Sequence, residues 1–213
     1  MDILSFLRNF DIVYWILRAI VVLLCISVHE AAHGFTAYKL GDNTAKWMGR
    51  ISINPMRHLD PVGALCMLFF GFGWAKPVMV NAYNFKNRKR GMALVSLAGP
   101  VSNLLLAFVG VIILKLMVVF NVPYIKILND FVQLLILLNI GLCVFNLIPI
   151  PPLDGSKIFL SLLPNKMYYD IMRYEHLGWI LLVVALSLGV LDPILSRVSF
   201  FIINMLISIV GGI

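Results

Sequence analysis

The chain has 213 residues, of which 61% are hydrophobic and only 13% are charged. Soluble globular domains are about half apolar and about one quarter charged, so this composition excludes an ordinary soluble domain and indicates a membrane protein. The formal net charge is +7, but most basic residues lie in loops between apolar segments. That distribution favours the positive-inside bias of membrane proteins over nucleic-acid binding. We therefore expect the chain to contact a lipid bilayer and no nucleic acid.

The apolar segments predict about five transmembrane helices. A span needs about 20 residues of helix, and the apolar segments lie at about residues 12–38, 92–120, 127–148, 177–191 and 194–213. Asp192-Pro193 breaks the chain between the last two segments, so we expect these to form a helical hairpin. The sequence has no internal repeat and no linker. We therefore predict a single integral-membrane domain over residues 1–213.

Residues 61–75 are apolar but too short to span a bilayer, and Gly71 and Gly73 interrupt them. A re-entrant loop covered by protein fits this pattern better than a span. Residues 50–54 and 77–81 flank the loop and alternate in polarity with period two, which predicts two strands. The predicted fold class is thus all-α and polytopic, with about five transmembrane helices and a small membrane-associated β-hairpin or re-entrant loop.

The basic residues predict the orientation in the membrane. If residues 61–75 do not cross, three loops share one side and hold 12 of the 17 basic residues: Lys39, Lys46, Arg50, Arg57, Lys76, Lys86, Arg88, Lys89, Arg90, Lys157, Lys166 and Arg173. The positive-inside rule places this side in the cytosol and the N-terminus outside.

His29-Glu30-Ala31-Ala32-His33 is an HExxH sequence inside an apolar segment. On a helix, positions i and i+4 lie on one face, so both imidazoles can bind one metal ion, with Glu30 beside them as a general base. Ionisable groups in a span are costly and usually functional. About 17 apolar residues precede His29, which places the metal near the cytosolic face.

A catalytic zinc site usually has three protein ligands and one open position. Asp154 is the best candidate for the third ligand, because the prolines before it end the helix and can direct its carboxylate at another helix. Asp154-Gly155 could instead simply form a turn or an N-cap. His58 and His176 are further candidate ligands, but a loop and a helix start favour surface or structural roles for them.

Three stretches resemble the site-2 protease family of intramembrane metalloproteases. They are HEAAHG at 29–34, GPVSN at 99–103 and NLIPIPPLDG at 146–155. The stretches GRISINPMRHLDPVG and FGWAKPVMVN are similar to the compact bacterial and archaeal branch that lacks a PDZ domain. The resemblance implies one zinc ion per chain at His29, His33 and Asp154, in a prokaryotic cell membrane. It also implies Glu30 as general base and Asn146 as a group that holds substrate or the oxyanion.

Other polar and glycine residues complete the expected site. Asn103 follows Gly99-Pro100, a predicted kink, and we expect it to support the site. An extended substrate could add as a strand to residues 77–81. We expect a substrate clamp built from Gly71, Gly73, Val78 and Val80.

The expected activity is hydrolysis of peptide bonds in the transmembrane segments of substrate proteins. A metal-ion transporter is an alternative, although its ligands should line a path open to both sides of the membrane. An inactive binding protein of the same fold is a second alternative. The sequence predicts no oligomeric state.

Overall fold

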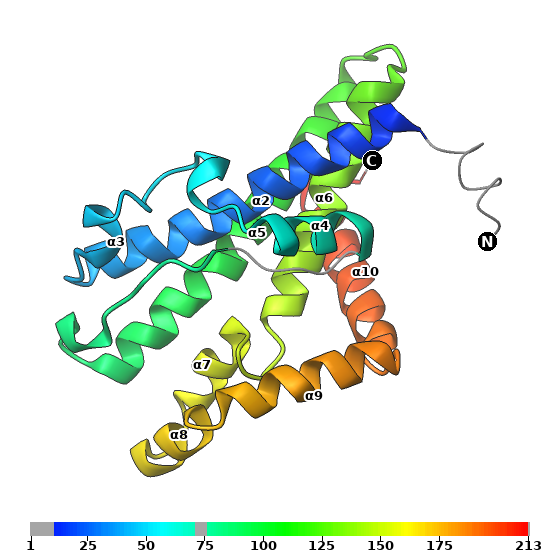
Figure 1. Ribbon diagram of the computed structural model, residues 1–213. Helices are drawn as coiled ribbons and strands as arrows, with labels where there is room; N and C mark the ends of the chain where they lie inside the picture. The colour runs from blue at the N-terminus through cyan, green and yellow to red at the C-terminus, as the bar shows by residue number, and fades with distance from the viewer. Residues whose placement is uncertain (1–10, 71–75, 213) are drawn as a thin grey trace.

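The computed structural model describes residues 11–70 and 76–212, which fold into helices joined by turns and loops (Figure 1). The α-helices are α2 (Ile12–Lys39), α3 (Thr44–Trp47), α4 (Pro61–Phe70), α5 (Arg88–Val119), α6 (Lys126–Asn146), α7 (Asp154–Leu160), α8 (Asn165–Met172), α9 (Glu175–Ser187) and α10 (Asp192–Ile209). Two short 3-10 helices are η1 (Pro55–Arg57) and η2 (Ala82–Asn84).

Four of these helices have the length and apolar composition of membrane spans, namely α2, α5, α6 and α10. The remaining predicted span, at residues 177–191, coincides with α9, which has 13 residues. At about 1.5 Å per residue α9 is only about 20 Å long, which is less than the hydrocarbon core of about 30 Å. The described residues therefore support a polytopic membrane protein with four candidate spans, to which α9 adds a shorter apolar helix.

At the end of the bundle opposite the loops rich in basic residues, polar contacts join the ends of several helices. Lys126 at the start of α6 pairs with Asp11, whose carboxylate caps α2 by accepting from the N–H groups of Val13 and Tyr14. Lys115, near the end of α5, donates to the carbonyl oxygen of Gly212 at 2.6 Å. The start of α2 and the C-terminal residues therefore lie at one end of the bundle, as four crossings require.

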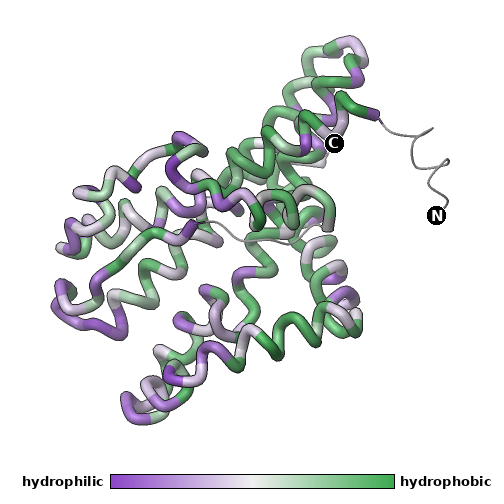
Figure 2. The backbone as a smooth tube through the Cα atoms, viewed as in Figure 1, coloured by the Kyte–Doolittle hydropathy of each residue, from purple (hydrophilic) through white to green (hydrophobic). Residues whose placement is uncertain are grey.

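Helices α2, α5 and α6 pack against one another in the core. Ala107 and Val111 of α5 meet Val132 and Ile140 of α6 in a buried cluster that Leu206 of α10 joins. The outer faces of the long helices carry exposed apolar side chains, among them Ile12, Ile16, Ile20, Phe200 and Phe201. Figure 2 shows the hydrophobic colour running along these helices and the hydrophilic colour gathering in the loops. An apolar exterior on a packed bundle is what a bilayer requires.

The predicted β-hairpin is not found among the described residues, which contain no strand. Residues 77–81 do alternate, with Val78 and Val80 half-buried and Pro77 and Met79 exposed. Their backbone nevertheless pairs with no strand. Pro77 has no N–H, and the N–H groups of Val78 and Asn81 donate to side-chain carboxylates. Side chains thus satisfy the donors for which the prediction expected a neighbouring strand.

The predicted re-entrant segment begins as a helix. Asp60 accepts a hydrogen bond from the N–H of Gly63 at 2.8 Å, at the first turn of α4. The helix has 10 residues, or about 15 Å, so it cannot cross a bilayer. That residues 61–75 do not span stays a prediction, because the described helix ends at Phe70. Gly71 and Gly73 lie outside the described residues.

Asp42 fixes the segment that follows α4 to the end of α2. Its fully buried carboxylate accepts hydrogen bonds from the N–H of Asn81 and the side-chain amide of Asn84, both at 2.7 Å, and from Thr44. Burial raises the pKa of this carboxyl, but the hydrogen bonds outweigh burial and hold the pKa below its ordinary value. The anchor therefore stays ionised at neutral pH.

Candidate metal centre

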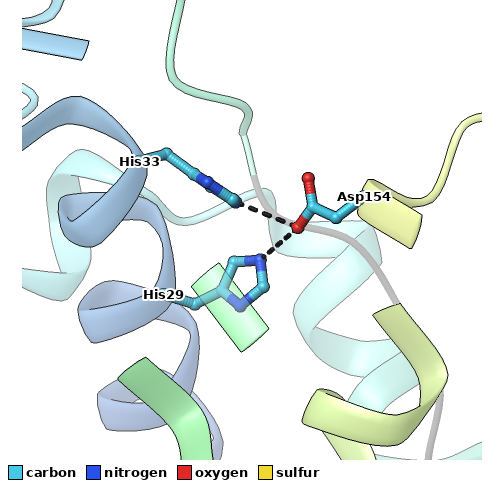
Figure 3. Close-up of side chains that lie close together, drawn as sticks. All are labelled: His29, His33 and Asp154. Atoms are coloured by element: carbon cyan, nitrogen blue, oxygen red, sulfur yellow. Dashed lines mark ion pairs between the residues drawn. The ribbon is translucent and has the colours of Figure 1, made fainter. Parts of the chain in front are cut away.

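The HExxH residues lie on helix α2, where His29 and His33 point toward the same carboxylate (Figure 3). Oδ2 of Asp154, the first residue of α7, lies 3.2 Å from Nε2 of His29 and 3.1 Å from Nε2 of His33. The side chains of His29, His33 and Asp154 are 10%, 11% and 12% exposed. Three potential ligand atoms from sequence positions 125 residues apart therefore meet in a buried site.

Each histidine is oriented by a group on α5. Nδ1 of His33 lies 2.7 Å from the carbonyl oxygen of Val95, and a carbonyl only accepts, so Nδ1 carries the hydrogen. Nδ1 of His29 lies 3.2 Å from the amide of Asn103, which is fully buried. Rotating that amide by 180° lets its otherwise unpartnered Oδ1 accept from Nδ1. Such contacts leave both Nε2 atoms free to bind a metal.

The donor set fits a zinc ion. With hydrogen on Nδ1, the Nε2 of neutral His33 directs a lone pair at the carboxylate oxygen of Asp154. That oxygen is buried and accepts no hydrogen bond within the described part of the chain. In this tautomer two acceptors face each other at 3.1 Å, an arrangement that suits a metal cation bound between them. Ligands about 2.0–2.1 Å from a tetrahedral zinc ion lie about 3.3 Å apart, close to the distances found.

Two glycines allow the helices to come this close. A Cβ at Gly99 of α5 would lie 2.5 Å from Cε1 of both His29 and His33, and 2.6 Å from Nε2 of His29. A Cβ at Gly155 would lie 2.3 Å from the carbonyl oxygen of Leu147, just beyond the end of α6. Real Cβ contacts are not so short, so both positions require glycine. Gly99 lets α5 pack closely against the two histidines. Gly155 lets the start of α7, which carries Asp154, pack closely against the chain just after α6.

A cavity of about 550 Å³ opens onto the three candidate ligands. Helices α2, α5, α6, α7 and α9 and residues 77–80 contribute its wall. Glu30 lines this cavity, and its Oε2 accepts a hydrogen bond from the backbone N–H of Val78 at 2.9 Å. A carboxylate beside a metal ligand set, in a cavity large enough for a peptide segment, is suited to acid–base chemistry.

Comparison with known proteins identifies the family. The sequence profile of "Peptidase family M50" matches residues 123–188. A Bacillus subtilis (strain 168) protein named "Putative zinc metalloprotease YwhC" is 42% identical over 185 residues, which cover 83% of this chain and 84% of that protein. The chain belongs to peptidase family M50, the site-2 protease family.

More distant relatives of this M50 chain carry similar names. "Putative zinc metalloprotease Rip2" of Mycolicibacterium smegmatis is 29% identical over 84% of this chain and 68% of its own length. "Zinc metalloprotease MJ0392" of Methanocaldococcus jannaschii is 26% identical over 89% of this chain and 48% of its own length. No solved structure matches the chain. The family and these names together support a zinc metalloprotease that is an integral membrane protein.

Two further predicted site residues of the M50 chain lie at the cavity wall, outside the group of three candidate ligands. Asn146 and Val80 line the cavity together with Glu30 and Val78. One N–H of the Asn146 amide donates to the carbonyl oxygen of Leu142 at 3.0 Å.

The two alternative histidine ligands do not join the metal centre. His58 is fully buried, with Nε2 2.7 Å from the carbonyl oxygen of Ser52. His176 is exposed at the start of α9. Asp154 is therefore the third member of the cluster.

Sequence reasoning did not predict several groups around this centre. The carbonyl oxygen of Val95 orients His33 although any residue type could supply it, so no sequence signal marks it. Helix α9 adds Glu175 and Trp179 to the cavity wall, and neither belongs to a recognisable motif. The close approach at Gly99 had a signal, because Gly-Pro inside an apolar span marks a site of helix contact or kinking.

Proposed function

We propose that this M50 chain is an intramembrane zinc metalloendopeptidase that binds one zinc ion and hydrolyses peptide bonds in the transmembrane segments of substrate proteins. The observation that carries the proposal is the meeting of His29, His33 and Asp154 in a cavity beside Glu30. Both histidines belong to a 28-residue apolar helix with the properties of a membrane span. A hydrolytic site at that position meets substrate within the bilayer.

The proposed reaction assigns a role to each side chain. His29, His33 and Asp154 would hold the zinc ion, which supplies a Lewis acid for water and for the scissile carbonyl. Glu30 takes a proton from the attacking water as the water oxygen adds to the carbonyl carbon. Glu30 then returns the proton to the leaving amine as the C–N bond breaks. The second N–H of the Asn146 amide is available to donate to the oxyanion.

Substrate would be held in extended form along residues 77–81. A helical substrate cannot be cut while its carbonyls are engaged in helical hydrogen bonds, and a freed backbone group in the bilayer needs a new partner. The N–H of Val80 has no hydrogen-bond partner in the described part of the chain. Strand addition there would satisfy the substrate backbone. Gly71 and Gly73, outside the described residues, remain proposed members of this clamp.

Zinc binding provides a direct check. We expect purified protein to contain about one zinc ion per chain, and His33→Ala to lose it, because a site of two protein ligands binds zinc poorly. Elemental analysis of both proteins measures this. His176→Ala, which changes an exposed histidine outside the cluster, should retain the metal and serves as the matched control. Equal zinc content in all three proteins would contradict the ligand assignment.

The active site is proposed to lie near the cytosolic face of a prokaryotic cell membrane. Loops on the metal side of the bundle carry 12 of the 17 basic residues, and such loops stay in the cytosol. We expect single cysteines in 82–91 and in 157–173 to react with a membrane-impermeant maleimide only after the inner face is exposed. Labelling of the two loops from opposite faces would contradict this topology.

The function itself is tested by comparing membranes that contain wild-type protein with membranes that contain Glu30→Gln protein. Quantitative proteomics should show one or more membrane proteins that accumulate uncut in the Glu30→Gln membranes. Their cleavage sites in wild-type membranes should map inside predicted spans. Identical membrane proteomes would contradict the proposed protease, and a metal-ion transporter or an inactive binding protein would then account better for the ligand cluster.

A further inference from the structure

The backbone of residues 76–81 touches the proposed general base directly. The N–H of Val78 donates to Oε2 of Glu30 at 2.9 Å, across a separation of 48 residues. Within the described part of the chain, Oε1 of Glu30 forms no hydrogen bond. One oxygen of the carboxylate is thus held by the protein, and the other remains available to the reaction.

The fold holds this N–H in place independently of Glu30. Two residues before Val78, the N–H of Lys76 donates to the carbonyl oxygen of His58 at 2.9 Å. Three residues after it, the N–H of Asn81 donates to buried Asp42 at 2.7 Å. The side chain of Val78 also lies against α2, because a Cβ added at Gly34 would be 3.5 Å from its Cγ1. The segment is therefore anchored on both sides of Val78.

We propose that the backbone N–H of Val78 positions the Glu30 carboxylate for catalysis. This inference rests on the proposed function, in which Glu30 is the general base. A glutamate side chain on a helix surface rotates among several rotamers. A fixed donor on Oε2 selects one of them and directs Oε1 toward the cavity. Val78 is thus a positioning residue, which acts through Glu30 and not on the substrate.

Val78 and Val80, both expected in the substrate clamp, then have different roles. Because its N–H is already bonded to Glu30, Val78 has no N–H to offer a substrate strand. Amide groups two residues apart in an extended chain point the same way, so the unpartnered N–H of Val80 faces the same side and is free to pair. Loss of the Val78 N–H should therefore lower kcat, and loss of the Val80 N–H should raise KM.

The test removes single N–H groups without changing side chains. Val78 is replaced by its α-hydroxy analogue through nonsense suppression, which converts the amide to an ester. Tyr124, an exposed residue outside the cavity that also follows a proline and whose N–H has no partner in the described part of the chain, receives the same replacement as a matched control. We expect kcat for the Val78 ester to fall about 10- to 100-fold, the scale of a small misplacement of a catalytic group. KM should stay within about twofold, since ground-state binding is intact, and zinc content should not change.

Amide hydrogen exchange at Val78 gives a readout that does not depend on activity. We expect Glu30→Ala to speed exchange of this N–H about tenfold or more, because its acceptor is lost. In Glu30→Gln the side-chain carbonyl can still accept, so protection should largely remain. Unchanged exchange in Glu30→Ala would overturn the proposal. A wild-type kcat in the Val78 ester, or an equal fall in the Tyr124 ester, would overturn it as well.

These outcomes are distinct from failure of the proposed function. If wild-type protein hydrolyses no transmembrane substrate, the protease assignment fails, whatever the esters do. If wild-type protein is active and the Val78 ester matches it, only the positioning role fails.

Discussion

Glu30→Gln is expected to reduce peptide hydrolysis by about 10²- to 10⁴-fold, the usual contribution of acid–base groups, while leaving the fold and the zinc content unchanged. Gln is nearly isosteric with Glu but can neither take a proton from water nor return one to the leaving amine. The metal cluster consists of His29, His33 and Asp154, so the substitution removes no ligand. The Gln carbonyl can also still accept from the N–H of Val78. Single-turnover cleavage of a transmembrane reporter, together with elemental analysis, measures both effects.

A comparison of two substitutions sharpens this result. Glu30→Ala removes both the base and the acceptor of the Val78 N–H, so it should lose activity at least as fully and also speed hydrogen exchange at that N–H. Glu30→Gln should lose only the proton transfer. Near-normal cleavage by the Gln variant would mean that another group is the base, and loss of zinc from it would mean that Glu30 supports the metal site.

The meeting of the three candidate ligands could be predicted because their spacing and surroundings are local properties of the sequence. His29 and His33 share a helix face whatever the rest of the fold does. Asp154 could be anticipated because prolines end α6 just before it, and the structure indeed brings it to both histidines. The long apolar segments likewise became helices close to their predicted bounds.

The strands were predicted wrongly because alternating polarity indicates which side chains are buried but not which groups the backbone bonds to. Residues 77–81 do bury alternate side chains, but the donors of Val78 and Asn81 are taken by Glu30 and Asp42. These carboxylates lie 48 and 39 residues away in the sequence. No local pattern predicts such a pairing. For α9 the sequence predicted a helix correctly, but it also predicted a membrane span, and the helix has only 13 residues.

Gly99→Ala is expected to cost at least about 100-fold in zinc affinity, the upper range for disturbing groups that orient metal ligands. A Cβ at this position would lie 2.5 Å from Cε1 of both His29 and His33. The nearest atoms belong to imidazoles that Val95 and Asn103, on the same helix as Gly99, already hold in place. The rings must therefore turn away from Asp154, or α5 must move off α2. Metal content after dialysis against graded zinc chelators measures the loss.

The matched control is Gly141→Ala in α6, where an added Cβ would meet nothing within 4 Å. Both substitutions raise helix propensity by the same amount, so a difference between them reports the contact with the histidines. Gly141→Ala should bind zinc and cleave substrate as the wild-type protein does. Added zinc should partly restore cleavage by Gly99→Ala if only affinity is lost. Wild-type zinc affinity in Gly99→Ala would show that α5 does not pack on the ligands as closely as described.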